Sequence, residues 1–65
     1  MKRRDLMKRL AQIAKAQGVE MHLTEGGNHT KVWIGDRSEM VPRHTEINEM
    51  TDQAIIRKLE GRQVE

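Results

Sequence analysis

The sequence contains no cysteine, no phenylalanine and no tyrosine, and only one tryptophan and one proline occur among its 65 residues. Without cysteine there is no disulfide framework to hold a fold together. No apolar run is long enough to predict a transmembrane helix, and no apolar stretch follows the basic N-terminus as it would in a secretory signal peptide. We therefore expect a cytoplasmic protein that does not associate with membranes.

The length of the chain limits it to one domain, residues 1–65. A domain of this size buries only about 60% of its unfolded surface, so it has a thin core and no room for a deep substrate cavity. Its work is expected on an exposed face, against a large ligand. The net charge is only +2, but basic residues gather near the N-terminus: Lys2, Arg3, Arg4, Lys8 and Arg9. Such a basic end suits phosphate, although a solvated helix face is the commoner origin of a charge run.

Two segments show the apolar periodicity of a helix. The first is Arg3–Gln17, in which the apolar residues Leu6, Leu10, Ile13 and Ala14 recur at helical spacing, and Gly18 is expected to end it. The second begins with Thr51 as the expected N-cap and ends at Gly61. Its predicted apolar stripe consists of Ala54, Ile55 and Leu59. Residues 62–65 are expected to be frayed.

Three strands are predicted between the helices. Residues 19–24 alternate, and the pattern predicts that Val19, Met21 and Leu23 are buried. A glycine turn at 25–28 leads into His29–Ile34, whose buried side would carry Thr30, Val32 and Ile34. After a turn at Gly35 and Asp36, residues 38–41 form a short third strand that Pro42 closes. An irregular link, 43–50, leads to the second helix.

This order predicts an α+β fold of the type α-β-β-β-α with a three-stranded antiparallel sheet. The two helices and the sheet share one core only if both helices cover the same sheet face. The other face stays open and would carry His22, His29, Lys31 and Trp33. Double-stranded-RNA-binding domains have the same order of elements, and we expect a fold of that kind, although topology does not establish function.

The segment Glu25-Gly26-Gly27-Asn28-His29 places a histidine just after a glycine turn, at the start of a strand. The glycine pair would permit positive φ and a close approach to another molecule. A histidine takes up and releases a proton near neutral pH, which makes His29 the candidate catalytic residue. The simpler alternative is a polar strand residue beside a turn, and spacing alone favours that alternative.

Other candidates have more than one interpretation. Lys31 and Arg43 are equally well phosphate contacts or ordinary surface charges. His44 could bond to the backbone, contact RNA or carry a second proton, and His22 is assigned no role. The three histidines are scattered, with no cysteine or paired carboxylate near them, so no metal site is predicted. Trp33 could stack on a base, contact a partner protein or lie in the core.

Several segments in order carry a resemblance to a known family. They are the helix at residues 2–10, the Glu25-Gly26-Gly27-Asn28-His29 segment, Val41-Pro42-Arg43-His44-Thr45-Glu46-Ile47, and a closing helix containing residues 54–59. Together they cover nearly the whole chain. In these segments the chain resembles the HicA family of toxins from bacterial toxin–antitoxin modules, also described as YcfA-like mRNA interferases.

The resemblance implies a ribosome-independent endoribonuclease that cleaves mRNA and is silenced by a HicB-type antitoxin in a hetero-oligomer. It also implies a single catalytic histidine, which maps onto His29, and no metal or other cofactor. The residues expected to contact RNA are Lys2, Arg3, Arg4, Lys8, Gly26, Gly27, Asn28, Lys31, Arg43 and His44.

Two alternatives to the enzyme remain open at this point. One is a non-catalytic RNA-binding module of the same fold, which needs no titratable residue at position 29 and would more naturally use Lys or Arg there. A weaker one is a small DNA-binding regulator, but the strands between the two helices do not resemble a helix-turn-helix motif.

Overall fold

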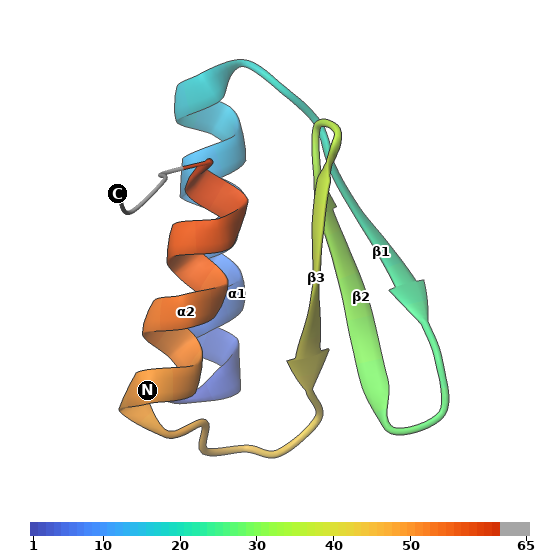
Figure 1. The fold of residues 1–65 in the computed structure, drawn as a ribbon, viewed down its shortest axis with the longest axis vertical. Helices are drawn as coiled ribbons and strands as arrows, with labels where there is room; N and C mark the ends of the chain where they lie inside the picture. The colour runs from blue at the N-terminus through green and yellow to red at the C-terminus, as the bar shows by residue number, and fades with distance from the viewer. Residues whose placement is uncertain (62–65) are drawn as a thin grey trace.

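The computed structural model describes residues 1–61, which form a helix, three strands and a second helix (Figure 1). The elements are α1 (Arg3–Gln17), β1 (Met21–Glu25), β2 (His29–Ile34), β3 (Arg37–Pro42) and α2 (Glu49–Glu60). The strands pair antiparallel in the order β1-β2-β3, and both helices lie on one face of the sheet. The predicted α-β-β-β-α layout is thereby confirmed. The expectation for residues 62–65 lies outside the described part.

The first helix has the predicted bounds. Its buried side chains are the predicted Leu6, Leu10, Ile13 and Ala14. Gly18 ends it in the left-handed region at φ +68°, where a residue with a side chain would be strained. None of the helices in the described residues has the length and apolar character needed to cross a bilayer.

The second helix begins earlier than predicted, and Thr51 is not its N-cap. Asn48 is the N-cap: its side-chain oxygen accepts a hydrogen bond from the Thr51 backbone N–H at 2.9 Å. Asn is among the strongest N-cap residues because its side chain satisfies a free N–H of the first turn. The apolar stripe also differs from the prediction, because Ala54 is exposed while Ile56 is buried.

One charged side chain of α2 lies inside the protein. Asp52 is only 2% exposed, and its Oδ2 lies 3.3 Å from the Met1 α-ammonium. The same ammonium donates a hydrogen bond to the Ile47 carbonyl oxygen, and the Ile47 N–H donates to the Met1 carbonyl oxygen. The beginning of α1 is thus tied to the connection that precedes α2.

The sheet has the expected second strand and a longer third strand. β2 has the predicted bounds, and β3 extends one residue beyond the prediction at each end. Pro42 is therefore part of β3, paired with His29. This position tolerates proline because β3 is an edge strand, and an edge residue need not donate its N–H to a neighbour.

The first strand buries less than its alternation predicts. Met21 packs against the core, but Val19 precedes the strand and is 38% exposed, and Leu23 is 50% exposed. Leu23 pairs with the fully buried Val32 and so shares its face. The difference arises because β1 is an edge strand that packs against α1 only in part: Met21 joins the core, whereas Leu23, farther along the strand, is half-exposed.

The core lies between the helices and the sheet. Its buried apolar residues are Leu6, Leu10, Ile13, Ala14, Val32, Ile34, Val41, Ile47, Ile55, Ile56 and Leu59. Ile47 comes from the irregular link between β3 and α2, where no periodicity marks a buried position.

A pair of leucine substitutions tests this placement of the core. Leu59→Ala removes a fully buried side chain and should destabilise the fold by about 2–5 kcal/mol, because it leaves a cavity. Leu23→Ala makes the same change at a half-exposed position and should cost less than about 1 kcal/mol. Denaturant unfolding of the two variants measures both values. Equal losses would contradict the arrangement of β1.

Candidate functional site

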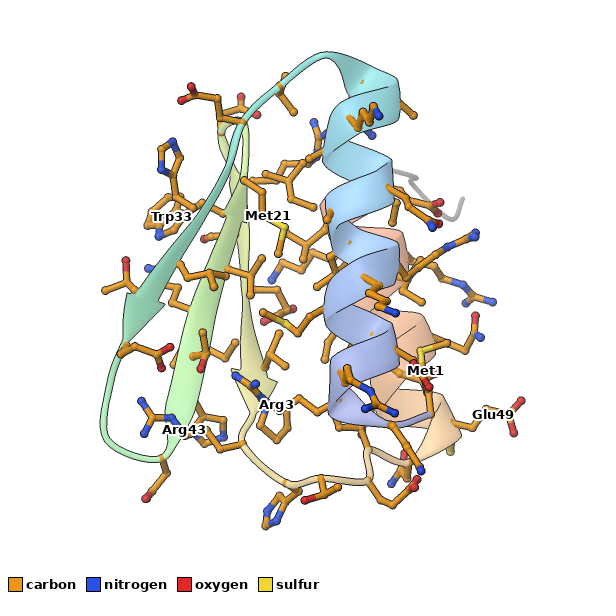
Figure 2. The ribbon with its side chains drawn as sticks, turned by 180° about the vertical axis from the view of Figure 1, so that it is seen from behind. Met1, Arg3, Met21, Trp33, Arg43 and Glu49 are labelled. Carbon is orange, nitrogen blue, oxygen red and sulfur yellow. The ribbon has the colours of Figure 1, made fainter. Side chains whose placement is uncertain are left out.

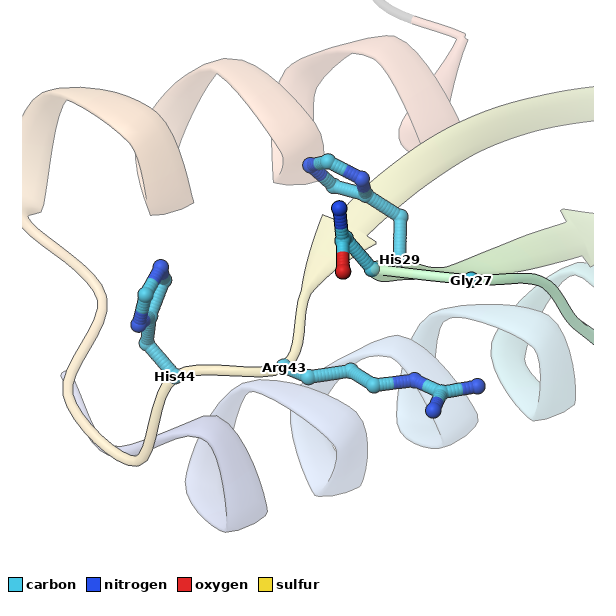
Figure 3. Close-up of a pocket in the computed structure, with 5 residues that line it drawn as sticks. Gly27, His29, Arg43 and His44 are labelled. Atoms are coloured by element: carbon cyan, nitrogen blue, oxygen red, sulfur yellow. The ribbon is translucent and has the colours of Figure 1, made fainter.

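The two sequence motifs meet at one end of the sheet. The register pairs His29, the first residue of β2, with Pro42, the last residue of β3. The glycine turn therefore lies beside the segment that follows β3. Between them is an open hollow of about 520 Å³, which we call the histidine hollow; it is lined by Gly27, Asn28, His29, Arg43 and His44 (Figure 3).

The two imidazoles of this hollow come from different segments and are both exposed. In the view of Figure 3, the rings of His29 and His44 project in the same direction from the chain, while the Arg43 side chain extends sideways toward the glycine turn. Two imidazoles beside one open hollow provide a proton acceptor and a proton donor for a single bound substrate.

A carboxylate fixes the relation between the glycine turn and the end of β3. Glu25 Oε1 accepts a hydrogen bond from Arg43 Nη2 at 2.6 Å, which is also an ion pair. The same Arg43 nitrogen donates to the Gly26 carbonyl oxygen at 2.7 Å. Because Arg43 lines the hollow, these contacts hold that part of its wall against the glycine turn.

A second arginine joins this carboxylate to the first helix. Thr30 is fully buried, and its hydroxyl donates to Glu25 Oε1 at 2.8 Å. The same hydroxyl accepts a hydrogen bond from Arg3 Nη2 at 2.8 Å, while Arg3 Nε donates to the Pro42 carbonyl oxygen at 3.2 Å. We call Arg3, Glu25, Thr30 and Arg43 the Glu25 network. It connects α1 and all three strands at the end of the sheet that carries His29.

The network also sets the charge of its acid. The hydrogen bond from Thr30 is the largest cause that lowers the pKa of Glu25 below its ordinary value, and Arg43 and Arg3 act in the same direction. Desolvation opposes them and does not reverse the shift. Glu25 therefore stays ionised near neutral pH.

The two glycines of the turn act differently from the prediction, since neither has a positive φ. The described glycines that do are Gly18, Gly35 and Gly61. The Gly26 N–H donates to the His29 carbonyl oxygen at 3.1 Å, and a Cβ at Gly26 would lie 3.3 Å from that oxygen. A Cβ at Gly27 would meet nothing. Gly26 is thus favoured by a tight turn, and only Gly27 contributes to the histidine hollow.

The predicted basic residues divide into two groups. Four of them line a second hollow of about 410 Å³, the basic hollow, whose residues are Lys2, Arg3, Arg4, Arg43 and Thr45. Arg43 belongs to both hollows. Lys8 is exposed on α1, one turn beyond Arg4. Lys31 lies elsewhere: its Nζ is 4.5 Å from the centre of the Trp33 ring.

Trp33 is not a core residue. It is half-buried and points away from the helices, whereas Met21 points toward them (Figure 2). His22 pairs with Trp33 across the sheet and forms a 3.1 Å contact with Glu20. The core interpretation of Trp33 is therefore wrong, and base stacking and partner contact stay open.

Sequence reasoning missed the part played by Glu25 and Thr30, and it took Arg3 only as a residue expected to contact RNA. A signal for Thr30 was present: the alternation of β2 placed its hydroxyl on the buried face, and a buried hydroxyl needs hydrogen-bond partners. Nothing in the spacing identifies Arg3 and Glu25 as those partners. In residues 1–61, no three His, Asp or Glu side chains are grouped so that they could hold a metal ion.

No family model, curated protein or solved structure matches this chain. The resemblance to the HicA family, and to double-stranded-RNA-binding domains, therefore stays a prediction.

Replacing Glu25 by Gln should lower the stability of the protein near neutral pH. A carboxyl group whose pKa is lowered by folding stabilises the folded state above its unfolded pKa and loses that effect as the pH falls through the folded pKa. The melting temperatures of wild type and Glu25→Gln should therefore differ most near neutral pH and converge below pH 4.5, the ordinary value for this carboxyl group. A constant difference across the acid range would show that Glu25 contributes no charge-dependent stability.

Proposed function

We propose that this protein is a metal-independent endoribonuclease and the toxin of a type II toxin–antitoxin module of the HicA kind. The observation that carries the proposal is that His29 and His44 line one open hollow, and that this hollow shares Arg43 with an adjoining basic hollow. Acid–base groups next to a phosphate-binding surface suit RNA cleavage. Both hollows are on the surface, as a polymeric substrate requires.

In the proposed reaction, the protein has to supply two proton transfers. His29, as a neutral imidazole, takes the proton of an RNA 2′-hydroxyl as its oxygen attacks the adjacent phosphorus. The bond from phosphorus to the 5′-oxygen breaks, and that oxygen takes up a proton from an imidazolium. The products are a 2′,3′-cyclic phosphate and a 5′-hydroxyl. DNA lacks the 2′-hydroxyl nucleophile and is spared.

His44 lines the same hollow as His29 and would share the proton transfers. A single histidine serves if it returns the proton that it took, and a pair serves if one imidazole accepts while the other donates. Neighbouring phosphates of the RNA lie against the basic hollow, where Lys2 and Arg4 are exposed. Their charges attract the RNA without reading its sequence.

A non-catalytic RNA-binding module is the second candidate. It is favoured by the pair Lys31 and Trp33 on the open sheet face, because a half-buried aromatic ring beside a cation can stack on a nucleobase without any histidine. The cleavage assay below separates the two candidates.

The proposed partner is a HicB-type antitoxin that covers the histidine hollow and the open face around Trp33. In that position the antitoxin would mask His29 and exclude RNA in one step. The toxin function places the protein in the cytoplasm, where mRNA is.

His29→Ala should leave RNA binding intact and lower the cleavage rate about 10²–10⁴-fold, because proton transfer loses its carrier. The measurement is cleavage of single-stranded RNA in EDTA, with product ends identified as cyclic phosphate. His22→Ala is the matched control, since its imidazole lies outside the hollow, and it should cut normally. His44→Ala should match the loss in His29→Ala if the imidazoles act as a pair. A folded His29→Ala protein that cuts at the wild-type rate would leave only the binding module.

RNA binding should weaken steeply with salt, because each cation on a phosphate releases counterions. Lys2→Ala should reduce the slope of log affinity against log salt by about one unit, since Lys2 lines the basic hollow. Lys15→Ala makes the same charge change near the other end of α1 and should alter the slope less. Affinities measured in the His29→Ala background avoid cleavage. Equal slopes for both variants would show that RNA does not lie against the basic hollow.

A further inference from the structure

We propose that Arg3, Thr30 and Arg43 form an anion site that the Glu25 carboxylate fills in the free protein, and that an RNA phosphate displaces this carboxylate when substrate binds. The identity of the ligand as RNA rests on the proposed function, whereas the anion site does not. In the free protein, the Glu25 carboxylate therefore occupies the position that an RNA phosphate takes in the complex.

The donors converge as they would on a phosphate oxygen. Glu25 Oε1 alone receives two hydrogen bonds, from the Thr30 hydroxyl and from Arg43. The Arg3 guanidinium stands behind Thr30 and is directed there by its bond to the Pro42 carbonyl oxygen. A guanidinium and a hydroxyl that both donate to one oxygen, with a second guanidinium bonded to that hydroxyl, are the kinds of donor that bind phosphate or carboxylate.

The fixed and the replaceable parts of the site can be told apart by burial. Thr30 is fully buried in the central strand, so this donor keeps its place whichever anion is bound. The Glu25 side chain is 60% exposed at the end of the edge strand β1, and that of Arg43 is 43% exposed. The carboxylate is therefore free to turn into solvent, where its hydration compensates for the bonds that it gives up.

The site also lies where the substrate passes. Arg3, Glu25 and Arg43 line a third hollow, of about 430 Å³. Arg43 is common to this hollow, the basic hollow and the histidine hollow. A phosphate in the place of the Glu25 carboxylate would thus lie next to the residues that act on its neighbour in the RNA chain.

Such an exchange has a consequence for affinity. In the free protein Glu25 neutralises Arg43, so RNA must compete with an internal anion before that arginine is available. Removing the carboxylate should open the site to small anions and strengthen RNA binding, although the protein alone becomes less stable. A purely structural salt bridge would show the loss of stability without the other two effects.

The first experiment uses inorganic phosphate as the probe and needs no RNA. Phosphate should raise the melting temperature of Glu25→Ala by roughly 5 °C or more at a concentration about tenfold above its Kd, relative to chloride at equal ionic strength. Asp36→Ala is the control: it removes a more exposed carboxylate at the other turn of the sheet and should respond as wild type does. If Glu25→Ala is unfolded alone, phosphate should restore its folded circular-dichroism signal. Equal responses in the two variants would overturn the anion site.

The second experiment measures single-stranded RNA binding in the His29→Ala background. Adding Glu25→Ala should lower the Kd several-fold, and adding Asp36→Ala should lower it less. Glu25→Gln keeps an acceptor for Thr30 and loses only the charge, so it tests the same point in a protein whose turn stays closed. If both Glu25 variants bind RNA more weakly than Asp36→Ala, the carboxylate does not compete with RNA and the proposal is wrong. Failure of wild-type cleavage would remove the proposed function while leaving the phosphate result standing.

Discussion

The contact between Glu25 and Arg43 joins the glycine turn to the segment after β3, which the register of β2 with β3 brings side by side. One carboxylate oxygen at the end of β1 holds an arginine that follows β3, and a buried threonine of β2 holds that oxygen in turn. Through Arg3 the first helix is drawn into the same set of contacts. Arg43 also lines the hollow that carries His29 and His44, so these contacts fix one part of its wall.

The parts of the fold that follow from local pattern were predictable from the sequence. The periodicity of Leu6, Leu10 and Ile13 and the glycine that follows gave the bounds of α1, and alternation gave those of β2. Patterns failed where a neighbour decides the outcome. Leu23 alternates correctly but is half-exposed because β1 is an edge strand, and Ile47 is buried without any periodic pattern, in a link that backbone hydrogen bonds join to Met1.

The candidate site shows the same division. The sequence singled out the histidine after the glycine turn and the Pro42-Arg43-His44 segment as candidates through the resemblance to a family, and the register of β2 with β3 brings them together. The sequence did not predict that Arg3 and Arg43 bond to Thr30 and Glu25. These partners are distant in sequence, and a charged residue alone does not indicate which residue it will bind. Lys31 was grouped with them by charge alone, whereas the strand carries it to the open face beside Trp33.

The first residues of the chain are bonded to the link before α2, and this bears on when the site forms during synthesis. Arg3 N–H bonds to the Thr45 carbonyl oxygen, and Met1 and Ile47 exchange backbone hydrogen bonds. The basic hollow thus needs the first residues and those around position 45 together. These contacts cannot close until residues 45–47 have been synthesised, and pairings so far apart in sequence are slow to form. Until then the growing chain lacks the basic hollow, although its first helix is already made.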